Sequence, residues 1–281
     1  MIAILGGLGA ATAWAITTMT AARASRLIGS PATLAWVMLT GLVVVGPVAL
    51  AEGKPALNGG ALVWLVLAGV GNIAGLLLVY NGLRIGKVGV VAPISSSEGA
   101  VAAVIAVVAG EHLGVGTGIA LGVIAVGIVV AARAASAVPD DERDDPRAIL
   151  FALGAAGAFG LGLYATGRAS VDLPIAWAVL PPRLLGVAFV TIPLVLAGRL
   201  RLTREAAPYV VGGGLAEVAG FVSYAVAARH SIAISAVLAS QFAAIAALAA
   251  AILFRERLGR AGIVGVIVIA AGVAAVSALR A

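Results

Sequence analysis

The chain has 281 residues, of which 62% are hydrophobic and only 11% are charged. Because soluble domains carry about 25% charged residues, this composition excludes a soluble globular protein and indicates an integral membrane protein. The net charge of +6 does not point to nucleic acid, because the basic residues stand singly or in short groups between apolar segments, where they fit anionic lipid and membrane topology.

Ten apolar segments follow one another along the chain, each near the length of about 20 residues that a membrane-spanning helix needs. They do not alternate as barrel strands would, and they are too long for such strands. Short connections require most neighbouring helices to run antiparallel. The predicted segments are 2–22, 31–51, 61–83, 88–109, 115–132, 148–167, 173–197, 206–228, 231–254 and 261–279.

A polar run at 134–147 separates the first five segments from the last five. It holds five of the twelve acidic residues and two of the eleven prolines. No helix with that charge could lie in hydrocarbon, so the run is expected to be a solvated linker.

The two halves resemble each other when the sequence is shifted by 145 residues without a gap. In a chain this rich in alanine, valine, leucine and glycine, matches between charged residues count most, and they indicate an internal duplication. Three charged pairs share the register: Arg23 with Arg168, Arg84 with Arg229, and Glu111 with Glu256.

Because each half contains an odd number of segments, the second half would start from the opposite side of the membrane. The sequence therefore predicts an all-α membrane protein in which ten transmembrane helices form two inverted five-helix repeats around a central cavity. The predicted divisions are a first repeat at 1–133, the polar linker at 134–147 and a second repeat at 148–281.

Lysine and arginine are distributed unequally between the two sides that this topology defines. Thirteen lie in the links between segments 1 and 2, 3 and 4, 5 and 6, 7 and 8, and 9 and 10, whereas the other side carries Lys54, Arg168, Arg229 and Arg280. The positive-inside rule then predicts that both termini lie outside the cytoplasm.

Short motifs near the end of each half resemble a known family. The stretch "AVAAVIAVVAGEHLG" at 100–114 and, more closely, "ASQFAAIAALAAAILFRERLG" at 239–259 resemble the fourth helix of an EamA-type repeat. The stretches "LLLVYNGLR" at 76–84 and "FVSYAVAAR" at 221–229 resemble its third helix, and Trp14 matches an aromatic position of its first helix. The chain thus resembles the drug/metabolite transporter superfamily in its ten-helix form. That resemblance implies an exporter of amino acids, metabolites or drugs, and termini on the cytoplasmic side, opposite to the charge count.

Three charged side chains lie inside apolar segments, where a charge costs about 2.5–3.5 kcal/mol on insertion scales and so needs a reason. They are Glu98, Glu217 and Arg183, and polar or aromatic residues of other segments lie at a similar depth. The predicted substrate-binding residues around the cavity are Trp14, Asn72, Tyr80, Ser95, Glu98, Tyr164, Arg183, Glu217, Tyr224 and Gln241.

Two roles are open for the charged residues. Arg183 and either glutamate would form a structural pair that faces protein. Alternatively, a carboxylate without a counter-ion in a low-dielectric site can exchange protons, as proton-coupled antiport requires, and this role suits Glu98 best. If the substrate is a zwitterion such as an amino acid, a carboxylate and Arg183 would receive its two ends.

Other features are expected to be structural. Pro181 and Pro182 should interrupt the seventh segment and free backbone carbonyls. Glu111 and Glu256 stand at segment boundaries and are expected to cap or lock loops.

No catalytic constellation is visible, so an enzyme is not expected. The chain has no cysteine, its two histidines lie in predicted loops, and it lacks a Walker-type loop for ATP. No cofactor or metal is expected. The sequence indicates a secondary transporter of small organic solutes, with protons as a candidate coupling ion and lipid as its surroundings, in the inner (plasma) membrane. The alternatives are an integral-membrane enzyme and a channel-like facilitator.

Overall fold

The computed structural model describes residues 1–85, 91, 94–135, 147–242 and 244–246, together with 249, 264, 267–268, 271–272, 275 and 278–279. Within these residues all regular structure is helical, as the composition predicts. The elements are α1 (Ile2–Ile28), α2 (Ser30–Ala51), α3 (Gly59–Ile85), α5 (Glu98–Val108), α6 (Val115–Ala135), α7 (Arg147–Asp172), α8 (Ile175–Val179), α9 (Pro181–Gly186), the π-helical turn η1 (Val187–Thr191), α10 (Ile192–Leu196), α11 (Ala207–Ala228) and α12 (Ile232–Ala239).

Among the described residues, six stretches are long and apolar enough to cross a membrane. They are α1, α2, α3 as far as Val79, α7, the broken helix at 175–196, and α11. Each of them coincides with a predicted segment. α5 falls within the fourth predicted segment, α6 covers the fifth and continues to Ala135, and α12 begins the ninth. The linker residues 136–146, Glu256 and most of the tenth predicted segment lie outside the described residues.

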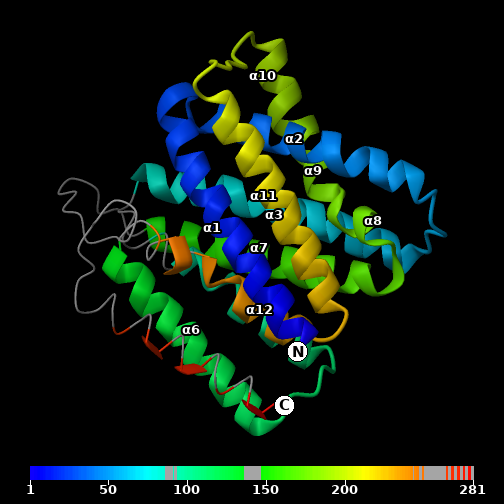
Figure 1. Ribbon diagram of the computed structural model, residues 1–281, viewed down its shortest axis with the longest axis vertical. Coiled ribbons are helices and arrows are strands. Elements are labelled where there is room, and N and C mark those ends of the chain that lie inside the picture. The colour runs from blue at the N-terminus through cyan, green and yellow to red at the C-terminus, as the bar shows by residue number, and fades with distance from the viewer. Residues whose placement is uncertain are drawn as a thin grey trace.

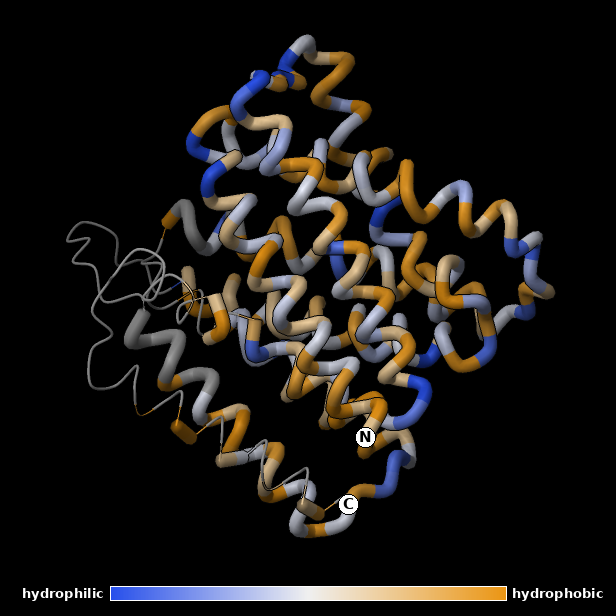
Figure 2. Tube along the Cα trace, viewed as in Figure 1, coloured by the Kyte–Doolittle hydropathy of each residue, from blue (hydrophilic) through white to orange (hydrophobic). Residues whose placement is uncertain are grey.

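The outer surface of the helices is apolar along their length. Figure 2 shows the most hydrophilic residues mainly at the turns where helices end, with mostly apolar stretches between them. Outward-facing side chains such as Leu50, Val108 and Leu196 are about four-fifths exposed, at 79%, 82% and 82%. Such continuous apolar exposure is what contact with lipid requires.

Two helix pairs form the centre of the bundle, α1 against α11 and α3 against α7 (Figure 1). Both pairs pack closely because glycine on one helix faces an aromatic ring on the other. A Cβ added at Gly75 would lie 2.5 Å from the ring of Phe159, and one added at Gly220 would overlap the indole of Trp14. Small residues at helix contacts are the usual means of close packing in membranes.

The seventh predicted segment is interrupted at Pro181 and Pro182, as the sequence predicts. α8 ends at Val179, Leu180 forms a bend, and α9 begins at Pro181. The amide of Arg183 donates to the carbonyl of Leu180 at 3.0 Å, and the carbonyl of Val179 accepts from the Arg183 guanidinium at 2.8 Å. The interruption therefore frees a carbonyl, as expected, and the arginine side chain satisfies it.

Contacts between turns define one end of the bundle, here called the Arg23 end. Arg23, near the end of α1, lies 3.7 Å from Glu205 in the turn before α11. The indole of Trp36 donates to the carbonyl of Arg201 at 2.9 Å. The junction of α1 and α2 at Gly29 and the turn at 199–206 thus lie at the same end.

The opposite end, here called the Gly53 end, is held by other turns. The Trp177 indole donates to the carbonyl of Gly53 at 3.0 Å, and Arg229 donates to the carbonyl of Leu173 at 2.8 Å. The turns at 52–58, 173–174 and 229–231 therefore meet here.

Candidate functional site

A cavity of about 200 Å³ lies among the central helices. It is bordered by α1, α3, α7 and α11, by the first residue of α5 and by a residue just after α12. Its lining combines carboxyl, amide and hydroxyl groups with aromatic rings. The lining residues are Trp14, Thr17, Thr18, Ala68, Asn72, Glu98, Phe159, Gly162, Leu163, Glu217, Phe221 and Phe242.

Glu98 is the first residue of α5 and is only 8% exposed. Ser96 and Ser97 form a turn immediately before it, and the Ser97 hydroxyl donates to the carbonyl of Ile94 at 2.7 Å. Within the described part of the chain the Glu98 carboxylate has no hydrogen-bond partner and no counter-ion. A buried carboxylate without a partner is costly, which makes Glu98 a candidate for a functional role.

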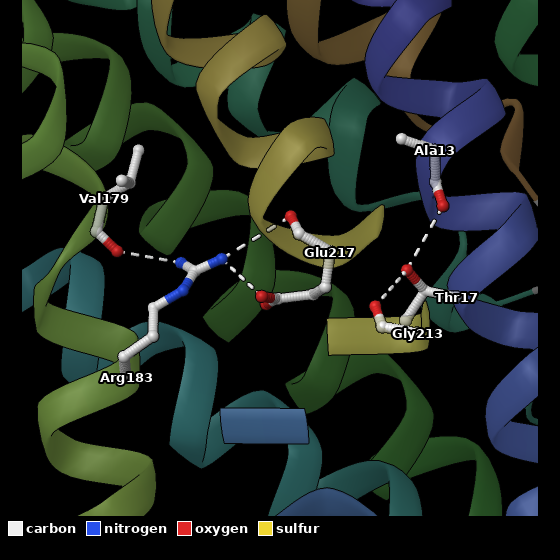
Figure 3. A network of polar contacts seen from close by, with 6 residues as sticks. All are labelled: Ala13, Thr17, Val179, Arg183, Gly213 and Glu217. Carbon is white, nitrogen blue, oxygen red and sulfur yellow. Dashed lines mark hydrogen bonds and ion pairs between the residues drawn. The ribbon is translucent and has the colours of Figure 1, made fainter. Parts of the chain in front are cut away.

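Glu217, on α11, is paired with Arg183 on α9. The Arg183 guanidinium donates to the Glu217 carboxylate and to the carbonyl of Val179 (Figure 3). Its planar face lies over the Phe221 ring, with Cζ 4.4 Å from the ring centroid. The arginine is completely buried. The pair that the sequence allowed for either glutamate is therefore confirmed, with Glu217 as the partner.

Aromatic rings form one wall of the cavity around Trp14. Its ring centroid lies 5.0 Å from that of Phe221 in an edge contact and 6.3 Å from that of Phe242. Tyr224 stands behind this wall, 6.2 Å from Trp14, and its hydroxyl donates to the carbonyl of Leu163 at 2.8 Å. These contacts hold the rings in a defined arrangement.

The remaining polar groups belong to α1 and α3. The Thr17 hydroxyl lies 3.1 Å from the carbonyls of both Ala13 and Gly213 (Figure 3), and the Thr18 hydroxyl donates to the carbonyl of Trp14 at 2.8 Å. Asn72 differs, because its buried Oδ1 has no hydrogen-bond partner. An unsatisfied buried amide oxygen calls for an explanation, and a bound solute would supply one.

The predicted binding residues fall into three groups. Trp14, Asn72, Glu98 and Glu217 line the cavity. Arg183 and Tyr224 stand directly behind lining residues. Ser95 and Gln241 are buried but are not among the lining residues, and Tyr164 packs by an edge contact against Trp64 at 5.6 Å. The side chain of Tyr80 lies outside the described part.

Sequence reasoning missed Phe242 as a lining residue. It is the neighbour of Gln241, which was predicted, but an aromatic side chain in an apolar helix gives no signal of its own. The glycine and alanine residues of the lining could not be identified from the sequence, because they have no functional group. Their small side chains contribute only open volume to the cavity.

A second pocket at the Gly53 end contains the predicted cap Glu111. Its carboxylate accepts from the Ser231 hydroxyl and from the amides of Ile232 at 3.1 Å and Ala233 at 3.2 Å. Glu111 therefore caps the N-terminus of α12 from a distant part of the chain, as predicted. Its predicted repeat mate, Glu256, lies outside the described residues.

Comparison with known proteins gives one family match. Residues 1–133 match the EamA-like transporter family. A solved structure, described only as the crystal structure of a protein, has a TM-score of 0.79 to this chain and covers 99% of it and 96% of its own length, at 17% sequence identity. At that identity the likeness concerns the fold alone. The comparison with curated proteins finds no match. The match of residues 1–133 identifies this part of the chain, just under half of it, as that of a membrane transporter of the drug/metabolite transporter superfamily.

Proposed function

We propose that the protein is a secondary transporter of small organic solutes, working by alternating access, with the central cavity as its transport site. The observation that carries the proposal is that both halves supply the lining at matching positions. Trp14 and Phe159 are related by the 145-residue offset, and so are Asn72 and Glu217. A site shared by two oppositely oriented halves is the arrangement around which such transporters rock.

Reciprocal contacts support the inverted repeat. If residue i of one half touches residue j of the other, two-fold symmetry requires the repeat mates to touch as well. Such exchanged pairs occur in the central packing: Trp14 faces Gly220 and Phe159 faces Gly75, while Arg183 faces Gly41 and Met38 faces Gly186.

The turn contacts support ten helices that alternate in direction. Each described contact joins turns that the ten-segment topology assigns to one face, including the contact between Glu111 and Ser231. α3 starts at the Gly53 end and α11 ends there. Arg84 and Arg229, at the last turn of α3 and just after α11, would then lie on opposite membrane faces, as inverted repeats require.

Proton coupling through Glu98 is part of the proposal. Glu217 is neutralised by Arg183, so Glu98 is the cavity carboxylate that can gain or lose a proton without breaking an ion pair. Protons entering the cell would then exchange for a solute leaving it across the inner membrane. The direction of transport follows from the family resemblance.

The test is solute counterflow in proteoliposomes. Vesicles loaded with members of a metabolite panel should take up labelled solute faster than empty vesicles, because a carrier with alternating access exchanges solute across the membrane. A channel-like facilitator would show no such acceleration. An imposed pH gradient should drive accumulation by the unaltered protein.

Two variants locate the coupling site. Glu98→Gln should lose the response to the pH gradient, whereas Glu52→Gln, a change at an exposed turn, should behave as the unaltered protein. Normal, pH-responsive transport by the Glu98→Gln, Glu217→Gln double variant would show that neither carboxylate serves coupling.

A further inference from the structure

The charge inside the cavity is unbalanced. Of its two carboxylates, Glu217 is compensated by Arg183, and Glu98 is not. None of the described residues that line the cavity is a lysine or an arginine. The cavity therefore carries one net negative charge when Glu98 is ionised, in surroundings where an unpaired charge is expensive.

Arg183 is not available to a solute. Its guanidinium is fully buried, and its two terminal nitrogens donate to Glu217 and to the carbonyl of Val179. The Phe221 ring lies against it, and its Nε, which has no hydrogen-bond partner, is buried as well. A solute carboxylate could reach this cation only by displacing Glu217, which would leave that carboxylate unpaired. This geometry argues against the zwitterion that the sequence suggested, because none of the described lining residues supplies a cation for its acidic end.

The aromatic wall suits a positive group. Trp14, Phe159 and Phe242 border the same space as Glu98, and so does Phe221, although Arg183 already lies against that ring. The face of an aromatic ring attracts a cation, by about 0.5–1 kcal/mol at exposed sites and about 2 kcal/mol or more when water is excluded. The same rings accept the apolar body of an organic solute.

The other polar groups mostly offer acceptors to the solute, with the unpartnered indole N–H of Trp14 as an exception in the described lining. The Thr17 and Thr18 hydroxyl hydrogens are directed to backbone carbonyls, which leaves oxygen lone pairs as their remaining capacity. Asn72 holds a buried Oδ1 without a partner. A primary ammonium group or a hydroxyl group on the solute would satisfy these acceptors, whereas a quaternary ammonium, which has no N–H, would need a hydroxyl elsewhere in the solute to do so.

We propose that the cavity binds a small monovalent organic cation, an ammonium or quaternary ammonium group, with Glu98 as its counter-ion and the rings around its apolar part. The volume of about 200 Å³ lies below the about 300–1,000 Å³ of drug-sized pockets, so the solute is small. This assignment deepens the proposed function and rests on the cavity being the transport site.

The test is equilibrium binding to the purified protein in detergent, using radiolabelled choline and n-butylammonium as probes. Competition with 3,3-dimethylbutan-1-ol, in which carbon replaces the choline nitrogen, isolates the effect of charge. Competition with trimethylglycine tests the zwitterion. We expect saturable binding of at least one cation and competition that is about tenfold or more weaker for the neutral and zwitterionic compounds.

Glu98→Gln should weaken cation binding about tenfold or more and leave the weak competition by the neutral alcohol unchanged. Glu52→Gln serves as the matched control and should bind as the unaltered protein does. Absence of saturable binding of both cations, equal affinity for the neutral isostere, or unchanged cation affinity in Glu98→Gln would overturn the assignment. Cation binding without counterflow would instead refute the transport proposal, and counterflow of a zwitterion without cation binding would refute only the present inference.

Discussion

At the scale of single residues, the buried ion pair of Arg183 and Glu217 sets the charge on one wall of the central cavity. Arg183 satisfies the carbonyl that the break at Pro181 frees and neutralises Glu217 at the same time. Burying two charges costs several kcal/mol per ion before their attraction is counted. Such a pair therefore contributes little net stability. Its effect is to neutralise the Glu217 carboxylate and to fix the position of both side chains.

Removing one partner of this pair should be more harmful than removing both. Arg183→Met is expected to destabilise the protein by about 3–5 kcal/mol, because it leaves Glu217 buried without a counter-ion. The double variant Arg183→Met, Glu217→Met should recover much of that loss. Thermal unfolding in detergent measures both, with Arg23→Met at the exposed pair as the control, expected to cost about 0–1 kcal/mol. A double variant less stable than Arg183→Met would contradict this account.

The three charged residues could be found from sequence because a charge is conspicuous in an apolar segment. The choice of partner for Arg183 could not be made, since Glu98 and Glu217 stand at similar depth in the predicted helices. That choice depends on the direction in which α9 presents its side chain, which the break at Leu180 sets. Phe242 was missed because an aromatic residue in an apolar helix has no distinguishing pattern.

At the scale of helices, two glycines determine how closely the central pairs approach. Gly75 and Gly220 each make room for an aromatic ring of the facing helix, Phe159 and Trp14 respectively. Because both rings line the cavity, helix packing and cavity shape depend on the same contacts.

Adding one methyl group tests this dependence. Gly220→Ala is expected to push the Trp14 indole aside, cost about 1–3 kcal/mol of stability and weaken solute binding. Gly212→Ala, on the same helix but with open space at its Cβ, should leave stability and binding unchanged. The unfolding temperature in detergent and the affinity for the solute should be measured for both variants and compared. Equal behaviour of the two variants would show that the close approach at Gly220 is unimportant.

The extent of most spanning helices could be predicted, because hydrophobic length alone specifies where a helix can cross a bilayer. The proline break in the seventh segment was also predictable. The turn at Ser96 and Ser97 before Glu98 could not be predicted. Serine is tolerated inside an apolar membrane helix, so it gives no signal that the helix is interrupted.

At the scale of the molecule, the contacts between turns separate two ends. The Arg23 end contains Arg201 and Arg204, whereas the Gly53 end contains Lys54 and Arg229. The charge count assigns the Arg23 end to the cytoplasm.

Single-cysteine labelling tests this orientation directly, since the native chain has no cysteine. In intact cells an impermeant maleimide should label Lys54→Cys and His230→Cys but not Arg26→Cys or Arg201→Cys, because basic turns resist translocation. The reverse pattern would mean that both ends are inverted, as the family resemblance implied. Labelling of Lys54→Cys without His230→Cys would contradict the shared Gly53 end.

Access to the central cavity from both sides of the membrane tests the account most directly. Thr18 lines the cavity on α1, so Thr18→Cys places a reactive thiol there. An impermeant maleimide should react with it in right-side-out and in inside-out vesicles, whereas Lys54→Cys and Arg201→Cys should each react from one side only. Reaction of Thr18→Cys from only one side, or from neither, would contradict alternating access through this cavity.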